Sequence, residues 1–170
     1  MRQQDEAAIL ACIPQLRRYA RGLTGQRERA DDLVQDTLER AWNRFSLWQR
    51  RGEVRAWLFA LMHNLFIDRV RSPRARLEEP AGDALPDMAG GAAPTDRLEL
   101  RDLDRALQRL PAEQREVLLL VAVEELSYKD LAAILGVPLG TVMSRLSRAR
   151  EGLRAELEGR RLPSRIQRVR

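Results

Sequence analysis

The residues best suited to bind a partner lie in one stretch near the C-terminal end of the chain, residues 127–150. This stretch is SYKDLAAILGVPLGTVMSRLSRAR, which combines hydroxyl groups, arginines and two glycines. Arginine guanidinium groups and Ser or Thr hydroxyl groups form hydrogen bonds with phosphates and with the edges of DNA bases. The chemistry we expect here is therefore hydrogen bonding to a nucleic acid, not the making or breaking of bonds.

Two short helices joined by a tight turn would position these groups. Ser127 is a good N-cap, and Asp130 follows three residues later, as in a capping box. Gly136 suits a left-handed turn, and Pro138 and Gly140 suit the start of a second helix. This pattern predicts a helix-turn-helix, whose second helix lies in the major groove of DNA. An ordinary helical hairpin with a solvated basic face is the alternative.

Composition supports an anionic partner and gives no sign of enzyme chemistry. The chain has 170 residues and a net charge of +5, and Lys129 is its only lysine. A GC-rich genome would also explain the arginine excess. Cys12 is the only cysteine and His63 the only histidine, so we expect neither a disulfide nor a Cys/His zinc site. Cys12 itself is expected to be a buried thiol, with redox sensing as the alternative.

No Gly-rich phosphate loop, HExxH motif or Ser/His/Asp set is present in the sequence. We therefore expect no enzyme and no cofactor. The carboxylate pairs Asp31–Asp32, Glu78–Glu79 and Glu124–Glu125 are expected to be solvated. We also expect no signal peptide and no membrane insertion, and hence a cytoplasmic protein.

Charge divides the chain into three parts. Residues 1–71 carry net +4, residues 72–96 net −3 and residues 97–170 net +4. The middle part is rich in Pro and Gly and shows no helical or strand period, so it is predicted to be a flexible linker between two domains. The basic tail, residues 160–170, is interpreted either as a phosphate-binding arm or as a solubilising segment.

Both domains are predicted to be all-α. In the first, Pro14 is expected to open or kink a long helix, and further helices should run from about Glu28 to Phe45 and from about Val54 to Val70. The helix that starts near Glu28 should bury an apolar stripe that includes Trp42. In the second domain, helices should begin near Thr95 and Pro111 and at the Ser127 cap.

Two other surfaces of the first domain attract attention. The helix near residues 28–45 has an acidic side, which would repel DNA and would meet a basic protein surface if it is functional; a normal solvated helix face is the alternative. The segment around Trp48 and Trp57 interleaves aromatic residues with arginines, as single-stranded DNA binding requires. At its helical spacing, however, Trp57 is expected to be a core residue.

Three segments together resemble a known family. ADDLVQDTLERAW (30–42), EVRAWLFALMHNLFIDRVR (53–71) and LPAEQREVLLLVAVEELSYKDLAAILGVPLGTVMSRLSRAR (110–150) are similar to bacterial sigma factors of the extracytoplasmic-function (ECF) group of the sigma-70 family. The resemblance implies a protein that binds core RNA polymerase and directs it to promoters. It implies sigma region 2 over residues 1–71, a linker over 72–96, and sigma region 4 over 97–170.

The same resemblance assigns candidate contacts. For binding to core polymerase they are Asp32, Gln35, Asp36, Glu39 and Arg40. For recognition and melting of the −10 element they are Arg51, His63, Asn64, Asp68 and Arg69. For recognition of the duplex −35 element they are Thr141, Met143, Ser144, Arg145, Ser147 and Arg148. Met143 departs from the family pattern, in which a Lys or Arg is common at this position.

The resemblance also implies an anti-sigma factor as a partner. Three other functions are weighed against the sigma factor. A nuclease or another DNA enzyme would need a credible cluster of acidic residues, which the sequence lacks. A stand-alone helix-turn-helix regulator would usually carry a sensor or dimerisation domain. A sigma-like decoy that binds only an anti-sigma protein should lose the basic face of its last helix, which this chain keeps.

Overall fold

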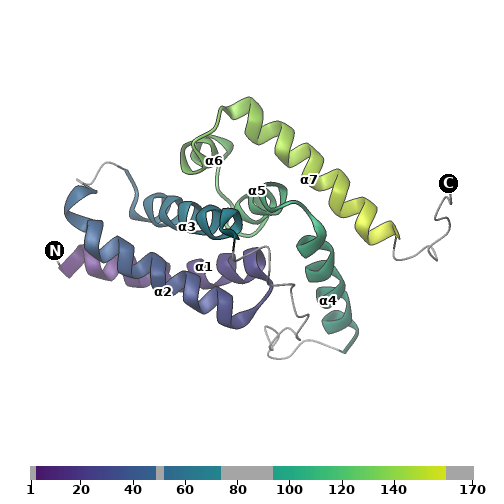
Figure 1. The fold of residues 1–170 in the computed structure, drawn as a ribbon, viewed down its shortest axis with the longest axis horizontal. Coiled ribbons are helices and arrows are strands. Elements are labelled where there is room, and N and C mark those ends of the chain that lie inside the picture. The colour runs from purple at the N-terminus through teal and green to yellow at the C-terminus, as the bar shows by residue number, and fades with distance from the viewer. Residues whose placement is uncertain (1–2, 49–51, 74–93, 160–170) are drawn as a thin grey trace.

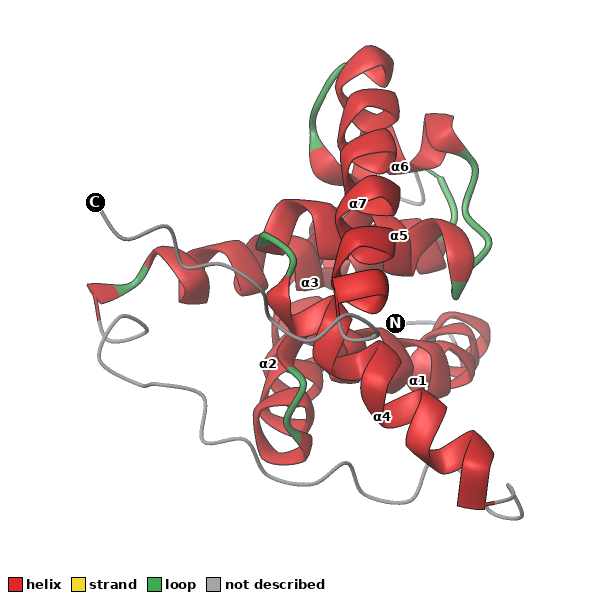
Figure 2. Cartoon of the chain, turned by 90° about the vertical axis from the view of Figure 1, so that its right-hand side faces the viewer, coloured by secondary structure: helices red, strands yellow, loops and turns green. Residues whose placement is uncertain are grey.

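The computed structural model describes residues 3–48, 52–73 and 94–159, and every regular element within these ranges is helical (Figures 1 and 2). The predicted all-α fold class is therefore confirmed. None of the described helices is long and apolar enough to cross a lipid bilayer. The elements are α1 (Gln3–Thr24), α2 (Arg27–Arg44), the short 3₁₀ helix η1 (Phe45–Leu47), α3 (Val54–Arg71), α4 (Pro94–Arg109), α5 (Ala112–Ala122), α6 (Tyr128–Leu135) and α7 (Leu139–Gly159).

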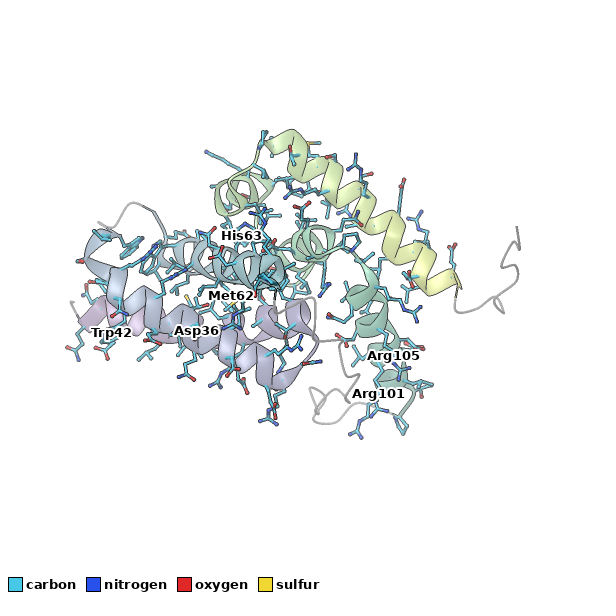
Figure 3. The ribbon with its side chains drawn as sticks, viewed as in Figure 1. Asp36, Trp42, Met62, His63, Arg101 and Arg105 are labelled. Carbon is cyan, nitrogen blue, oxygen red and sulfur yellow. The ribbon has the colours of Figure 1, made fainter. Side chains whose placement is uncertain are left out.

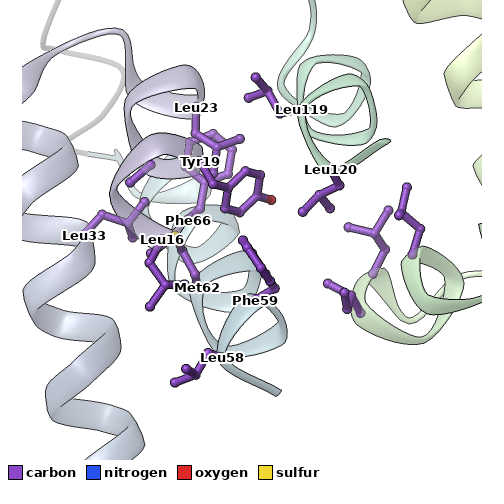
Figure 4. Packing of buried hydrophobic residues seen from close by; sticks show 14 of the residues in the cluster. Leu16, Tyr19, Leu23, Leu33, Leu58, Phe59, Met62, Phe66, Leu119 and Leu120 are labelled. Atoms are coloured by element: carbon purple, nitrogen blue, oxygen red, sulfur yellow. The ribbon is translucent and has the colours of Figure 1, made fainter. Parts of the chain in front are cut away.

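Helices α1, α2 and α3 form the N-terminal half, packed around a shared apolar core. Tyr19 of α1 and Phe59 of α3 meet edge to face, with ring centroids 5.2 Å apart. Leu16, Leu33 and Met62 pack around this pair (Figure 4). The bounds of α2 and α3 agree with those predicted from the sequence, and in α2 the periodicity places the residues of this core on one face of the helix.

One expectation for this half was wrong in part, and a second was wrong. Helix α1 begins at Gln3 and continues through Pro14, so the proline does not open it. The proline ring lies on the exposed side of α1, where the missing backbone N–H affects a single position of a long helix. Trp42, predicted to lie in the buried stripe of α2, is 56% exposed. Cys12 is buried as expected, and burial raises the pKa of its thiol, with Arg55 opposing that shift.

Helices α4 to α7 form the C-terminal half. The apolar run of α5 is buried, as predicted for a helix. The Ser127 Oγ accepts a hydrogen bond from the Asp130 N–H at 3.1 Å and caps α6. Gly136 is left-handed, with φ of 64°, and the N–H groups of Gly136 and Val137 both bond to the Ala132 carbonyl. This closure ends α6 and starts the turn into α7, so the predicted helix-turn-helix is confirmed.

The two halves pack against each other through α5, which lies between α1 and α7 (Figures 1 and 4). Helix α1 contacts α4 and α5, and α3 contacts α6. The buried residues of both halves form one continuous cluster. Of the predicted linker 72–96, residues 74–93 lie outside the described part of the chain, and α4 begins at Pro94.

Replacing Gly136 by Ala should destabilise the protein by about 1 kcal/mol, because a Cβ at φ of 64° is strained. Gly140, near the start of α7, has no positive φ, and no atom lies within 4 Å of the place that a Cβ would take there. Gly140→Ala should therefore be neutral or slightly stabilising. Urea unfolding of both variants measures the difference. Equal stabilities would mean that the turn at Gly136 is not left-handed in solution.

Candidate nucleic-acid interface

The outer face of α7 presents the predicted −35 residues together. Val142, Leu146 and Ala149 bury the opposite face of this helix. The exposed residues of the outer face are Met143, Ser144, Ser147 and Arg148. Thr141 and Arg145 are half-buried beside them. Helix α7 contacts only α4, α5 and α6 among the described elements, so the N-terminal half leaves this face uncovered (Figures 1 and 2).

Two of these residues already have partners within the chain. The Arg145 guanidinium lies 3.5 Å from a carboxylate oxygen of Glu113 on α5. The Ser144 hydroxyl donates to the Thr141 carbonyl at 3.1 Å. Arg148 is exposed, and a guanidinium in that position suits a bidentate contact with a guanine or a phosphate.

The acidic side of α2 forms a second surface. Asp32, Gln35, Asp36 and Glu39 are exposed and Arg40 is half-buried. A shallow depression of about 340 Å³ runs beside them, lined by Asp36, Glu39, Arg40, Asn43, Arg44 and Leu65. The exposed indole of Trp42 lies on the same helix (Figure 3). Carboxylates, an amide and an aromatic ring on one exposed helix suit a basic protein surface that also offers apolar contacts.

The predicted −10 residues are not all brought to one open face. Asn64 and Asp68 of α3 are exposed. Arg69 forms an ion pair with Asp36, which joins this face to the acidic side of α2. His63 instead points toward the C-terminal half (Figure 3). Arg51 lies outside the described residues.

An aromatic stack stands at the start of α3. The rings of Trp48 and Trp57 are stacked with centroids 5.5 Å apart and planes inclined by 24°. Phe45 packs against both rings. Trp57 is half-buried against the hydrophobic core, in agreement with its predicted core position. The stack therefore packs the end of η1 against the start of α3.

A buried acid that sequence reasoning missed joins the two halves. Glu116 of α5 is 1% exposed. Its Oε1 atom accepts a hydrogen bond of 2.8 Å from the Tyr19 hydroxyl. The same oxygen lies 2.6 Å from Nδ1 of His63. Burial raises the pKa of the Tyr19 phenol well above its usual range, and the nearby Glu116 carboxylate raises it further. The phenol therefore stays protonated and acts as the donor to Glu116.

Glu124 was predicted to be solvated, and this prediction was wrong because its side chain is fully buried. Its two oxygens accept bidentate hydrogen bonds from Arg18, each 3.0 Å long. Arg55 donates to the Glu124 backbone carbonyl at 2.6 Å and lies 3.3 Å from its carboxylate. The next residue, Glu125, is left-handed with φ of 53°, and the Leu126 N–H bonds back to the Leu120 carbonyl, which closes the turn after α5.

The C-terminal end of α1 is capped by side chains of the other half. Gln108 donates to the Gly22 carbonyl at 2.8 Å, and Arg115 donates to the Leu23 carbonyl. A helix end leaves its last carbonyls without partners along the helix, so donors from elsewhere must satisfy them. The C-terminal half therefore completes a helix of the N-terminal half.

Replacing Tyr19 by Phe removes the hydroxyl donor to a buried carboxylate. We expect a loss of about 1–3 kcal/mol in the free energy of unfolding. Tyr128, the only other tyrosine, is 37% exposed at the start of α6, so Tyr128→Phe should have little effect. Thermal or urea unfolding of the two variants provides the measurement. Equal losses would rule out a structural hydrogen bond from Tyr19 to Glu116.

Comparison with known proteins agrees with this geometry. The family "Sigma2 domain of PhyR" matches residues 9–63, and "Sigma-70, region 4" matches residues 100–153. The ECF RNA polymerase sigma factor EcfG of Rhodopseudomonas palustris is 42% identical over 149 residues, which cover 88% of this chain and 82% of the relative.

Two solved structures extend the likeness to the arrangement of the halves. The sigma factor RpoE of Bartonella quintana, solved with the anti-sigma factor NepR, is 34% identical, with a TM-score of 0.75 over 92% of this chain and 98% of RpoE. CnrH, solved with the cytosolic domain of CnrY, is 28% identical, with a TM-score of 0.68 over 91% of this chain and 88% of CnrH. This chain therefore belongs to the ECF group of RNA polymerase sigma factors, which direct core polymerase to promoters to initiate transcription.

Proposed function

We propose that three helices of this sigma factor each bind a different partner or promoter element. The acidic side of α2 binds core RNA polymerase, α7 recognises the duplex −35 element, and α3 captures the −10 element as a single strand. The observation that carries this proposal is the outer face of α7, which a capped helix-turn-helix holds away from the N-terminal half.

Recognition of the −35 element follows from the position of α7. The N-terminal turn of α7 offers backbone N–H groups to a phosphate. Arg148 is then placed to reach the edge of a base in the major groove. Met143, 52% exposed, replaces a cation with an apolar side chain, which suits contact with a thymine methyl group rather than with guanine.

Docking on polymerase depends on the charge of α2. Asp36 is paired with Arg69, but both side chains are substantially exposed, and exposed ion pairs contribute only about 0–1 kcal/mol. Asp36 can therefore exchange Arg69 for a basic residue of the polymerase at little cost. This exchange would also release Arg69 to contact DNA.

Melting of the promoter requires the protein to bind the single-stranded −10 element more tightly than the duplex. Asn64 and Asp68 on α3, together with Arg69, present polar groups that suit an unstacked base of the non-template strand. Binding the open strand and not the duplex raises the population of open promoter. The phosphodiester chemistry remains with the polymerase.

An anti-sigma factor is the proposed regulatory partner. RpoE was solved with the anti-sigma factor NepR, and CnrH with the cytosolic domain of CnrY. The likeness of this chain to both covers its two halves, and such a partner would contact both.

The decisive test is transcription by purified core polymerase with a genomic promoter library. Adding this protein should produce specific transcript starts that core polymerase alone does not make. Unchanged transcription would reject the proposal and would favour a decoy that binds only an anti-sigma protein.

Arg148→Ala should weaken promoter binding by about 1–3 kcal/mol when measured with polymerase present. The loss should disappear on a promoter whose −35 element has been scrambled, because the base contact no longer exists there. If Arg148→Ala lowers the affinity equally for both promoters, Arg148 contacts a phosphate rather than a base.

Glu39→Lys should weaken binding to core polymerase about tenfold, because it opposes a basic partner surface with like charge. Glu158→Lys makes the same charge change at an exposed position of α7 and should leave this affinity unchanged. Titration of labelled protein with core polymerase at moderate salt measures both. If the two variants bind equally well, α2 is not the docking helix.

A further inference from the structure

We propose that Glu113 of α5 is a positioning residue for recognition of the −35 element, because its carboxylate holds the Arg145 guanidinium at the edge of the outer face of α7. The positioning role rests on the function proposed above, in which α7 binds the −35 duplex. Glu113 lies on a different helix from every candidate −35 residue predicted from the sequence.

Glu113 and Arg145 face each other where α5 packs against α7 (Figure 1). The Nη2 atom of Arg145 lies 3.5 Å from the Oε2 atom of Glu113. The side chain of Arg145 is 21% exposed and that of Glu113 is 56% exposed. The pair therefore lies between the buried side of α7 and its outer face. A guanidinium has five N–H donors, so an ion pair at one nitrogen leaves donors for DNA.

Close packing fixes the distance between the start of α5 and α7. A Cβ placed on Gly152 of α7 would lie 2.9 Å from a methyl group of Leu110, which precedes α5. Arg145 lies about two turns before Gly152 on the same side of α7. A second ion pair, 3.1 Å long, joins Arg109 at the end of α4 to Glu156 of α7. Glu113 is thus held on a packed helix, which positions a side chain more accurately than a loop does.

The negative charge of Glu113 is unexpected beside a surface that binds DNA, because DNA phosphates repel a carboxylate. Glu113 also lies in the first turn of α5, where the helix dipole stabilises an acidic side chain. That local effect would explain the residue without any role in recognition. The two explanations predict opposite results. Removing an acid that has only the local effect should strengthen DNA binding, whereas removing an acid that positions Arg145 should weaken it.

Holding Arg145 in place reduces the entropy that is lost when DNA binds. A long side chain loses rotamer freedom when an interface immobilises it, and this loss lowers the affinity. Arg145 is already paired in the free chain. Arg148, by contrast, has no ion-pair partner in the part of the chain that the structure describes. Arg145 is therefore suited to a contact prepared in advance, and Arg148 to a contact formed on binding.

The test measures the affinity of labelled promoter DNA for holoenzyme assembled from core polymerase and each full-length variant. Glu113→Ala should weaken promoter binding about three- to tenfold, although it makes the protein more positive. Glu113→Asp keeps the carboxylate and should retain most of the affinity. Glu156→Ala is the matched control, because it removes the acid from the other ion pair of α7. Its affinity should stay within about twofold of the wild type.

A double-mutant cycle shows whether Glu113 acts through Arg145. Arg145→Ala should weaken promoter binding at least as much as Glu113→Ala, and the double variant should bind no more weakly than Arg145→Ala alone. Urea unfolding separates this effect from a loss of stability. Glu113→Ala and Glu156→Ala should both unfold at nearly the wild-type urea concentration, because exposed ion pairs contribute little to stability.

Promoter binding by Glu113→Ala that equals or exceeds the wild type would overturn the positioning role. An equal loss from Glu113→Ala with and without Arg145 would also overturn it, as would an affinity of Glu113→Asp as low as that of Glu113→Ala. In each case a loss from Arg148→Ala on an intact −35 element would leave the proposed function standing. If neither Arg145→Ala nor Arg148→Ala changes the affinity, α7 does not bind the −35 element, and the proposed function and the positioning role are both rejected.

Discussion

Two carboxylates buried between the halves of the chain constrain the rest of the structure. Glu116 lies within α5 and Glu124 lies just after its C-terminal end, and both depend on groups from α1 and α3 for their hydrogen bonds. A buried charge without such partners would be strongly unfavourable. The apolar residues of α5 alone would allow the halves to slide or rotate, whereas the two acids allow one position. The helix that anchors the DNA-binding unit is thus also the helix that fixes it to the N-terminal half.

Local features of the sequence predicted most of the elements. The Ser127 cap, the left-handed Gly136 and the apolar run in α5 depend on near neighbours, so each was predictable from a few residues. Glu116 and Glu124 were missed because their partners lie 53 to 106 positions away. A Glu-Glu pair after an apolar helix has the pattern of a solvated end, and only the fold reveals that the first of the pair turns inward. Pro14 was misjudged because an exposed proline can lie within a long helix that packing stabilises.

The same division applies to the proposed functional surfaces. The residues of α2 and α7 were predictable because helical spacing places them on one exposed face each. The position of His63 was not, because α3 has no strongly one-sided pattern and contacts both halves. Its placement toward Glu116 couples a residue of the proposed −10 face to the arrangement of the whole chain. Under the proposed function, recognition of the −10 element and contact between the halves would compete for the same side chain.

Small-angle X-ray scattering of the free protein tests the shared core of the two halves most directly. A chain of this length with one shared core should have a radius of gyration of about 16 Å and a pair-distance distribution with a single maximum. A distribution with two separate maxima, one within each half and one between them, would show two independent modules and would contradict the account.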